Sequence, residues 1–487
     1  MAKMVIGGEV VAALSNDEYP VYNPANGAIV DTAPKGDARD VDRAVDAAER
    51  AFPKWWATPG AKRGELVGVG ARKITEYEDE LARILTREQG KPLLEAKREI
   101  RRFVHTLEHY AGLGKNLRGG YVPNLDDGKY GIILKRPIGV VAAIVPWNFP
   151  VSLMGNKIAP ALVAGNTIVV KPASTTPLTD LRVIELLNQV LPRGVLNIIT
   201  GPGITAGEAV LAHPKIRKIG FTGATETGRH VMQVAAQTIK RVTLELGGSD
   251  PMIVCDDANI DEAVSAASVG RYYNCGQACL AIKRVYVFDQ VYEQFVDKLA
   301  GKVKKLRVGD GMAKTSMLGP LHTAAQRQEV EEQLADALKH GGQVLVGGTR
   351  PQGAEFEKGN YLQPALIVDA DHQARVAQEE VFGPALPVWR VRDLDEAIAR
   401  ANSSIYGLGS SVWTRDLNKA NRAAEQLEAG YTWINSAAII YDELPFGGFK
   451  QSGVGKEHGS EALDYYSETK AVVIGTIADQ EDAARGE

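Results

Sequence analysis

The stretch Lys218-Ile219-Gly220-Phe221-Thr222-Gly223-Ala224-Thr225-Glu226-Thr227-Gly228 decides the fold. It runs from an apolar β-type segment through a glycine turn into an amphipathic pattern with helical spacing. The same order of apolar strand, glycine or proline turn and helix repeats between Gly139 and Gly248. Parallel strands need such crossover connections, so the pattern predicts a doubly wound α/β domain with helices on both faces of a parallel sheet.

The expected strands of this domain are continuous apolar runs, as burial on both faces requires. They are Val140–Val145, Thr167–Val170, Val195–Thr200, Lys218–Phe221 and Val242–Leu244, with helices at Asn156–Ala164, Leu178–Val190, Ile204–Ala212 and Thr227–Gln237. A second α/β block is expected after Gly248. Its strands are Ile253–Cys255, Val285–Phe288, Gln343–Val346, Ala365–Val368, Ala385–Val391 and Ser410–Trp413, and its helices start at Ile260 and cover Val291–Val303.

The N-terminal part has a helical period followed by a hairpin pattern. The expected helices begin after Asp40, which can cap the first, and continue over Glu65–Tyr77, Glu80–Gln89 and Leu93–Leu113. Gly120–Leu125 and Lys129–Leu134 flank Asp126-Asp127-Gly128, which is a hairpin signal. Because a two-stranded hairpin is marginal alone, we expect it to join another sheet.

Composition excludes several classes of protein. The 487 residues are too many for one core and indicate two or three domains. A net charge of -4 gives no reason to expect nucleic acid or an anionic membrane as partner. Three cysteines cannot form a disulfide framework, and with eight histidines they show no paired metal-ligand spacing, so we expect a reducing compartment and no metal. Met1–Val11 has no secretory pattern and no apolar run could span a bilayer, so we expect a cytoplasmic protein.

A reactive cysteine is the first candidate for chemistry. The segment Asn274–Arg284 holds Cys275 and Cys279, and Cys279 precedes the apolar run that ends at Phe288. A thiol on a loop that feeds a buried strand is well placed to react. The alternative is a small buried hydrophobe, which is the commoner role of a free cysteine.

Two further motifs are candidates for binding a nucleotide. The loop Gly223–Gly228 lies between a strand and a helix, where glycines allow a diphosphate to approach the helix N-terminus. Lys171 closes a buried strand, from which it could reach a ribose or phosphate at the edge of the sheet. A plain strand-to-helix turn and a solvated strand end remain the alternatives.

Glu245 and Asn148 are candidate catalytic side chains. Glu245 lies at the end of an apolar strand, where burial would raise its pKa and suit it to act as a general base, unless the position is an exposed edge. Asn148 lies between Pro146 and Pro150 in a constrained turn. Its amide could stabilise an oxyanion, or could bond its own backbone as turn asparagines usually do.

Taken together in this order, the motifs resemble those of the NAD(P)-dependent aldehyde dehydrogenase superfamily over nearly the whole chain. They are Pro146–Pro150, Lys171, Gly223–Gly228, Glu245–Gly248, Gly276–Cys279, Glu380–Pro384 and Pro445–Gly448. The resemblance implies a cofactor-binding domain (residues 1–117 and 137–248), a catalytic domain (249–448) and a small β oligomerisation arm (118–136 and 465–487). In this family the hairpin pairs with the C-terminal strand, here about residues 467–475, and a homodimer or homotetramer follows.

The resemblance also implies the mechanism and the site residues. Cys279 would attack the aldehyde and pass through a thiohemiacetal and a thioester, Asn148 and the Cys279 N–H would stabilise the oxyanion, and Glu245 would activate water. The implied cofactor-binding residues are Pro146, Trp147, Lys171, Ser174, Gly201, Gly223, Ala224, Gly228, Leu246 and Glu380, of which Glu380 would hold the nicotinamide ribose.

Departures from the family pattern bear on the cofactor and the substrate. Ser174 stands where NAD-preferring relatives often have a glutamate, so NADP is favoured and NAD remains possible. The cysteine motif is similar to that of the succinate-semialdehyde branch, but Asn156 and Tyr273 replace its carboxylate-binding arginines. We therefore expect a non-dicarboxylic aliphatic, aromatic or small hydroxyaldehyde, of the lactaldehyde or benzaldehyde type, in an apolar funnel lined by Tyr273, Ile440 and Phe446. Succinate semialdehyde is the alternative.

Other classes of function stay open on the sequence alone. A cofactor-free cysteine acyl transferase or thioesterase would need a histidine base near Cys279, and no histidine lies in a recognisable motif. A non-catalytic binding protein would not need Cys279, Glu245 and Asn148 together. Cys275 is treated as a neighbour of the nucleophile that could form a reversible disulfide with it under oxidation.

Overall fold

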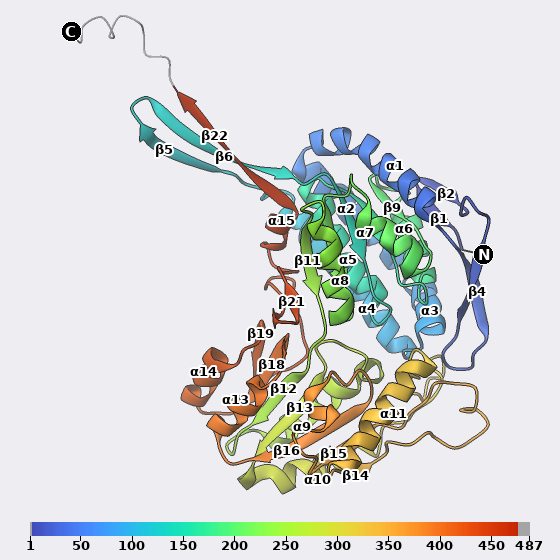
Figure 1. Ribbon diagram of the computed structural model, residues 1–487, viewed down its shortest axis with the longest axis vertical. Coiled ribbons are helices and arrows are strands. Elements are labelled where there is room, and N and C mark those ends of the chain that lie inside the picture. The colour runs from blue at the N-terminus through green and yellow to red at the C-terminus, as the bar shows by residue number, and fades with distance from the viewer. Residues whose placement is uncertain (1, 476–487) are drawn as a thin grey trace, which may run out of the picture.

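Two large sheets, each covered by helices, form the body of the protein, and a three-stranded arm projects from it (Figure 1). The computed structural model describes residues 2–475. The first sheet lies in the N-terminal half of the chain and the second in the C-terminal half. This α/β architecture with two parallel-type sheets confirms the predicted fold class.

The first sheet has five parallel central strands with antiparallel strands at its two edges. Its order is β2 (Glu9–Val11), β1 (Met4–Ile6), β9 (Leu196–Ile198), β8 (Thr167–Lys171), β7 (Val140–Ile144), β10 (Lys218–Thr222), β11 (Arg241–Glu245) and β21 (Gly453–Val454). The edge strand β21 comes from the C-terminal part of the chain, so the two halves are interlocked rather than merely linked.

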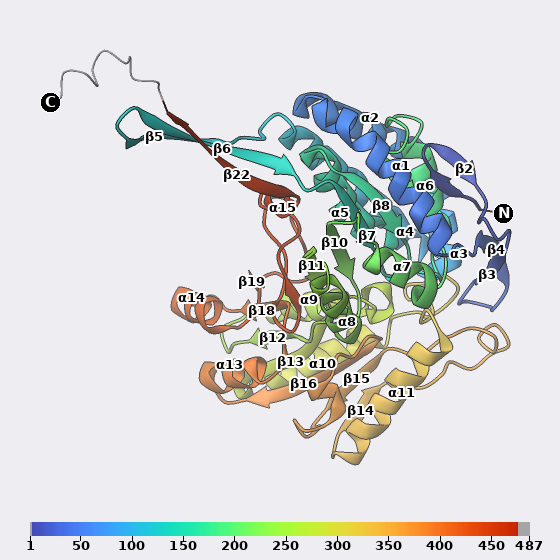
Figure 2. The ribbon, with the colours of Figure 1, turned by 45° about the horizontal axis from the view of Figure 1, so that its top comes forward.

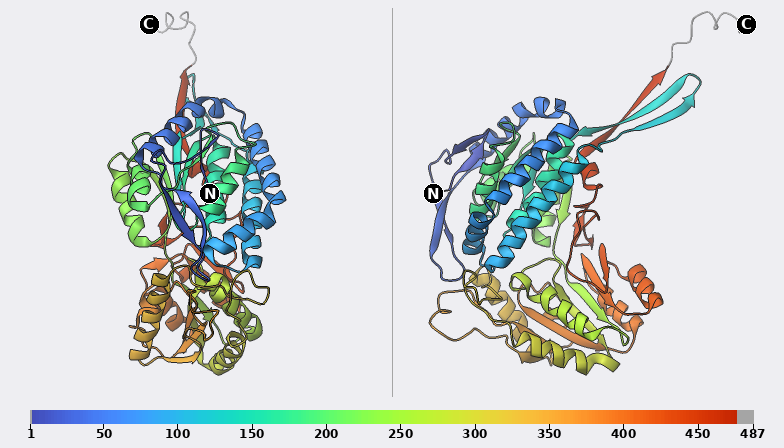
Figure 3. Two further views of the ribbon diagram at one scale, coloured as in Figure 1. Left: turned by 90° about the vertical axis from the view of Figure 1, so that its right-hand side faces the viewer. Right: turned by 180° about the vertical axis from the view of Figure 1, so that it is seen from behind.

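Helices cover both faces of this sheet, so successive residues of a strand are buried on opposite sides. Val140 and Ala142 belong to one apolar cluster, whereas Val141 and Ala143 belong to the other. The first face packs against α1 (Ala38–Ala57), α7 (Glu208–Ala212) and α8 (Thr225–Ala236). The second packs against α5 (Pro150–Ala164) and α6 (Leu178–Leu187), backed by α2 (Gly60–Glu76), α3 (Glu78–Gln89) and α4 (Leu93–Leu113). The left panel of Figure 3 shows these two helical layers on opposite sides.

The second sheet is parallel except for one edge strand. Its order is β14 (Gln343–Val346), β15 (Ala365–Val368), β16 (Ala385–Val391), β13 (Ile282–Phe288), β12 (Asp250–Val254), β18 (Gly409–Trp413) and β19 (Tyr431–Ile434). Its helices are α9 (Ile260–Tyr272), α10 (Tyr292–Val303), α11 (Ala324–Lys339), α12 (Arg375–Gln378), α13 (Leu394–Asn402) and α14 (Leu417–Gln426), and α15 (Ala462–Tyr465) leads into the arm. Figure 2 shows this sheet below the first, with β12 and β13 side by side.

The arm consists of β5 (Gly120–Asp126), β6 (Lys129–Pro137) and β22 (Ser467–Gly475) in the order β22-β6-β5. The pairing of β22 with β6 runs from Ser467 opposite Pro137 to Gly475 opposite Lys129. The hairpin therefore gains the third strand that the sequence required, and the right panel of Figure 3 shows it standing clear of the body. Residues 476–487, which were also assigned to the arm, lie outside the described residues.

Several local predictions need correction. Asp37, not Asp40, is the N-cap of α1, and Asp40 completes a capping box by accepting a bond from the Asp37 N–H. The helix expected to reach Val190 ends at Leu187. The strand expected over Val195–Thr200 keeps only three residues. Within residues 2–475, no helix is long and apolar enough to cross a membrane.

Candidate active site

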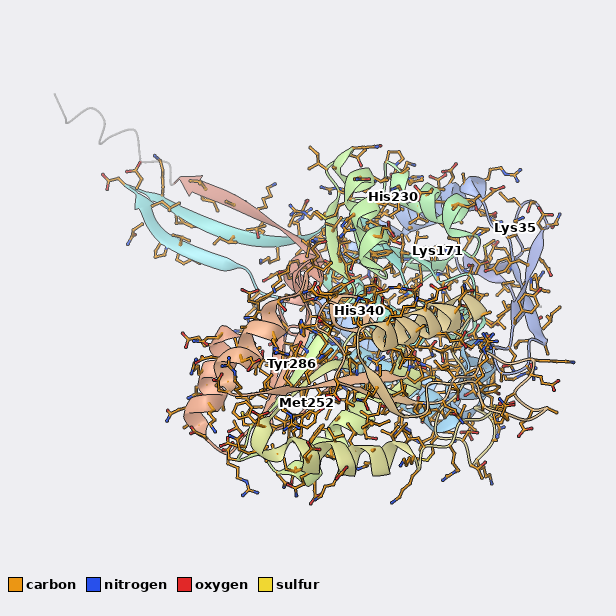
Figure 4. The ribbon with its side chains drawn as sticks, turned by 60° about the horizontal axis from the view of Figure 1, so that its bottom comes forward. Lys35, Lys171, His230, Met252, Tyr286 and His340 are labelled. Atoms are coloured by element: carbon orange, nitrogen blue, oxygen red, sulfur yellow. The ribbon has the colours of Figure 1, made fainter. Side chains whose placement is uncertain are left out.

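The candidate catalytic and cofactor residues lie along one edge of the first sheet. Asn148 follows β7, Lys171 ends β8, Gly223 follows β10 and Glu245 ends β11. These four strands are parallel, so their carboxyl ends meet at the same edge. In Figure 4, Lys171 lies in the lobe built on the first sheet, and Met252 and Tyr286 lie in the second sheet, which forms the other lobe.

Cys279 reaches the same edge from the second lobe. It lies in the connection between α9 and β13, after a tight turn over Tyr273–Gly276. A Cβ atom at Gly248 would lie 2.7 Å from the Cys279 carbonyl oxygen, which places the end of the Glu245 segment directly against the cysteine. The three candidate catalytic residues therefore come from both lobes.

Asn148 is held against the cysteine loop by three hydrogen bonds. Its Nδ2 donates to the carbonyl oxygen of Gln277 at 3.2 Å, two residues before Cys279. Its own carbonyl accepts from Lys91 Nζ at 2.7 Å and from Asn274 Nδ2 at 2.9 Å. The side-chain amide is thus fixed beside the thiol segment, as an oxyanion donor would need.

The Cys279 side chain is partly exposed, and the surroundings of its thiol shift its pKa upward. Burial raises its pKa to about 12; Lys283 acts to lower that pKa, while Glu380, Asp250 and Glu245 raise it further. No histidine is among the groups of the described residues that act on it. All three cysteines are free, and Cys275 and Cys255 are fully buried.

Glu245 is a buried carboxyl group without a hydrogen-bond partner. Its side chain is 3% exposed, and neither oxygen is bonded within residues 2–475. Burial, assisted by Glu457, raises its pKa well above the usual range, whereas Lys157 and Lys456 act to lower it. A Cβ atom at Gly447 would lie 2.8 Å from Oε1, so the carboxyl group faces the segment after Pro445.

A buried ion pair that the sequence did not reveal lies behind Glu245. Lys157 Nζ contacts Glu457 Oε1 and Thr222 Oγ1, both at 2.6 Å. Asn156 donates to the other Glu457 oxygen at 3.3 Å. Asn156, one of the two residues at the expected carboxylate-binding positions, is therefore a neutral amide that already has a partner.

Several residues assigned to the cofactor have backbone features that allow a ligand to approach. Ala224 is the N-cap of α8, so the first N–H groups of that helix point to the edge of the sheet. Gly228 allows close packing, since a Cβ atom there would lie 2.4 Å from Leu246 Cδ2. Gly201 has φ 144°, and a Cβ atom there would lie 2.4 Å from the carbonyl oxygen of Gly36.

Lys171 and Trp147 are two further residues assigned to the cofactor. Burial lowers the pKa of Lys171 to about 8, and its only partner among the described residues is the carbonyl oxygen of Pro172 at 3.0 Å. Trp147 stacks on His322 with ring centroids 4.6 Å apart. Pro146 and Ser174 are partly exposed beside these residues in the chain. A lysine without an acid partner, a glycine cradle and a helix N-terminus fit a dinucleotide.

The three predicted substrate residues come from two segments of the chain, the cysteine loop and the segment that ends at Phe446. Tyr273 stacks on Phe149, with centroids 6.0 Å apart, and forms one wall near the cysteine loop. Phe446 is buried against Tyr431 and His458. Ile440 is partly exposed, on a segment that packs on α9 through Ala438, which lies 3.7 Å from the Cβ position of Gly270.

Sequence reasoning missed the residues that hold the site in place. Lys91, Asn274 and Gln277 fix Asn148 and the cysteine loop, and Lys283 lies behind Cys279. Only Lys283 had a visible signal, because a charged side chain in an apolar strand run requires a buried partner.

Comparison with known proteins identifies the family. A model described as the aldehyde dehydrogenase family matches residues 11–472. The chain is 42% identical to the succinate-semialdehyde dehydrogenase (NADP+) GabD of Escherichia coli K12 over 97% of each chain. It is 39% identical to a phenylacetaldehyde dehydrogenase of Pseudomonas fluorescens over 97% of this chain and 95% of that one. A crystal structure of betaine aldehyde dehydrogenase from Staphylococcus aureus in complex with NAD+ matches with a TM-score of 0.96 and 36% identity, over 98% of this chain and 96% of that chain. The chain therefore belongs to the aldehyde dehydrogenase family and is an NAD(P)-dependent oxidoreductase that acts on aldehydes.

Proposed function

We propose that this enzyme oxidises a non-dicarboxylic aldehyde to its carboxylic acid through a thiohemiacetal and a thioester on Cys279, with NADP as the favoured cofactor. The observation that carries the catalytic part is the bond from Asn148 Nδ2 to the Gln277 carbonyl. It fixes an amide donor from one lobe beside the nucleophile of the other.

The chemistry begins when the Cys279 thiolate forms a bond to the carbonyl carbon and the oxygen takes up the electron pair. Asn148 Nδ2 and the Cys279 N–H stabilise that oxyanion. Lys171, the Gly223–Gly228 loop and Glu380 would hold NAD(P), which would supply the acceptor for the hydride on that carbon. Glu245 then takes a proton from water, whose oxygen attacks the thioester carbon, and the C–S bond breaks to release the acid. Its raised pKa makes Glu245 a stronger base once it is ionised.

A direct experiment separates this function from its rivals. Absorbance at 340 nm should rise with an aldehyde and NADP, and Cys279→Ala should abolish the rise. A cofactor-free acyl transferase or a binding protein would give no signal with either form.

The cofactor preference rests on the loop after β8. Ser174 adds no negative charge near Lys171, so a 2′-phosphate would meet no repulsion there. The E. coli relative is named for NADP+, and the S. aureus structure holds NAD+. We expect a higher kcat/KM with NADP, and a loss of that preference in Ser174→Glu. A tenfold or larger preference of the wild type for NAD would overturn this assignment.

The substrate class rests on the two positions where a dicarboxylic semialdehyde would need cations. Asn156 is engaged with Glu457, and Tyr273 stacks on Phe149. The nearby Arg102 is paired with the buried carboxylate of Asp442. Aromatic, aliphatic and small hydroxyaldehydes should therefore outrank succinate semialdehyde in kcat/KM. Succinate semialdehyde, the substrate in the name of the E. coli relative, is the alternative and would displace this proposal by ranking first.

The arm supports a homo-oligomer. It stands clear of the body and exposes several large apolar side chains, which are Tyr121, Val122, Leu125, Leu134 and Val473. An exposed apolar sheet is a surface that a second copy can cover. Light scattering should return a dimer or tetramer, and a 52.5 kDa monomer would refute the assignment.

A further inference from the structure

Lys283 is a fully buried ammonium group directly behind the candidate nucleophile. Its side chain is 0% exposed, and it lies on β13, four residues after Cys279. Its Nζ donates to the carbonyl oxygen of Cys279 at 2.5 Å and to that of Ala278 at 2.9 Å. Among residues 2–475, the only carboxylate that it pairs with is Glu380, whose Oε1 lies 3.0 Å away.

This ion pair leaves one oxygen of Glu380 available. Oε1 forms the ion pair with Lys283 and accepts a hydrogen bond from the Gly248 N–H at 3.1 Å, and no hydrogen bond within residues 2–475 reaches Oε2. The Glu380 side chain is 18% exposed. A Cβ atom at Gly247 would lie 2.4 Å from Oε2, so this oxygen lies against the glycine segment that follows Glu245. Glu380 is thus held by one oxygen and presents the other.

A second buried carboxyl group, Asp250, also raises the pKa of the thiol, and the charge of Lys283 opposes it. Asp250 accepts the Gly409 N–H at 3.0 Å through one oxygen, and its Oδ2 is buried without a partner in the described chain. Burial raises the pKa of Asp250 to about 7, and the charge of Lys283 acts against that rise. Without Lys283, the thiolate of Cys279 would form beside Glu380 and Asp250 and would lack the cation that opposes their effect on its pKa.

We propose that Lys283 is a positioning residue with two effects: it holds Glu380 so that Oε2 faces the nicotinamide ribose, and its charge favours the thiolate of Cys279. This inference rests on the proposed roles of Cys279 and Glu380. A lysine that only neutralised buried carboxylates would stabilise the fold without affecting the ionisation of the thiol or the binding of cofactor.

Two substitutions separate the charge from the geometry. Lys283→Met removes the charge while keeping the length of the side chain, whereas Lys283→Arg keeps the charge and changes its shape. Lys240→Met is the matched control, because Lys240 is also buried and donates to two backbone carbonyls, those of His213 and Ile216, away from the site. Each variant is compared with the wild type as the full-length enzyme.

The first readout is alkylation of Cys279 by iodoacetamide as a function of pH, followed by peptide mass spectrometry. Lys283→Met should move the rate profile upward by about one pH unit or more, a shift typical of losing a neighbouring charge. Lys283→Arg should stay near the wild-type profile. The second readout is the KM for NADP, which should rise about tenfold in both variants, because Glu380 loses its anchor or shifts. Lys240→Met should alter neither readout.

Unchanged alkylation and KM in Lys283→Met would overturn the proposal, as would equal changes in Lys240→Met. If Lys283→Met does not fold, the double variant Lys283→Met/Glu380→Gln removes the Glu380 charge that would otherwise be left unpaired. Its KM for NADP should equal that of Glu380→Gln. Its alkylation profile should still lie at higher pH than that of Glu380→Gln. A double variant with the alkylation profile of Glu380→Gln alone would also refute the charge effect. The proposed function is tested separately by Cys279→Ala, which should lose all activity. That result does not depend on the cofactor KM or on the alkylation profile measured for Lys283→Met.

Discussion

The buried carboxylate of Asp442 accepts hydrogen bonds from four side chains, and we predict that this cluster, called here the hub, stabilises the fold. Asp442 accepts hydrogen bonds from Arg102 at 2.7 Å, His105 at 2.6 Å and His458 at 2.7 Å, and from Thr106 at 3.2 Å. Its side chain is fully buried. The hub joins α4 to the segment that carries Ile440 and Phe446. Asp442→Asn keeps the shape and removes the charge.

The cost follows from the loss of a buried, paired charge. Breaking such a pair lowers the free energy of unfolding by about 3–5 kcal/mol. Arg102 is partly exposed and can be hydrated once the charge of Asp442 is removed, so we expect a value near the lower end, roughly 3 kcal/mol. We expect the melting temperature of Asp442→Asn to fall by roughly 3 °C, because the unfolding entropy of a 487-residue chain is about 1 kcal/mol/K. The loosened segment should also raise the KM for aldehyde while the KM for NADP stays unchanged. Asp46→Asn, which breaks a surface pair with Lys215, is the control and should cost less than about 1 kcal/mol.

The pH dependence provides a second check. Burial alone would raise the pKa of Asp442, but the bond from His458 and the charges of Arg102 and His458 outweigh it and hold the pKa well below the usual range. A depressed pKa in the folded state stabilises the protein above the unfolded value of about 3.9, and this gain is lost as the pH falls toward the folded value. The difference in melting temperature between wild type and Asp442→Asn should therefore be largest above about pH 4 and shrink below it. Differential scanning fluorimetry between pH 3.5 and 8 measures it. A gap under about 1 °C at pH 7, or one that widens in acid, would refute the reasoning.

Three further outcomes are expected. Asn148→Ala should lower kcat by about 10²–10³ with a nearly unchanged KM for NADP, as loss of one oxyanion donor does, and a wild-type kcat at 340 nm would remove Asn148 from that role. Glu245→Gln should still release about one equivalent of NADPH per site in a stopped-flow burst and then turn over slowly, because acylation continues while water is no longer activated; a steady state equal to the wild type would contradict this. Val473→Asp, on an exposed strand of the arm, should shift the enzyme toward the 52.5 kDa monomer in light scattering, and an unchanged mass would exclude the arm as the interface.

The sequence predicts well those parts of the fold that have a long helical period or an uninterrupted apolar run. The periodic run Leu93–Leu113 and the apolar runs Ala365–Val368 and Ala385–Val391 have the predicted bounds. Helix α11 was not predicted, because it buries few residues and has little apolar periodicity to detect. The cap at Asp37 was misplaced by one turn, since both Asp37 and Asp40 have acceptor side chains that suit a helix start.

The candidate site divides in the same way. Residues with a motif of their own, such as Cys279, Asn148 and Glu245, can be named from the sequence and meet at one edge. Residues that act through a distant partner cannot. Glu457 became visible only when the structure placed it beside Lys157, because nothing near either residue in the sequence points to the other.

The cysteine loop shows why this boundary is physical. Asn274 and Cys275 have φ of 49° and 55°, a left-handed conformation that costs non-glycine residues of order 1–3 kcal/mol. Contacts from outside the loop hold this conformation: the Asn274 N–H donates to Glu95 of α4 at 2.9 Å, and the His322 N–H donates to the Gln277 side chain at 2.8 Å. The local sequence disfavours this backbone, and only the assembled lobes stabilise it. The geometry that aims Cys279 at Asn148 is therefore a property of the tertiary structure, and the strength of these contacts sets how firmly the nucleophile is held.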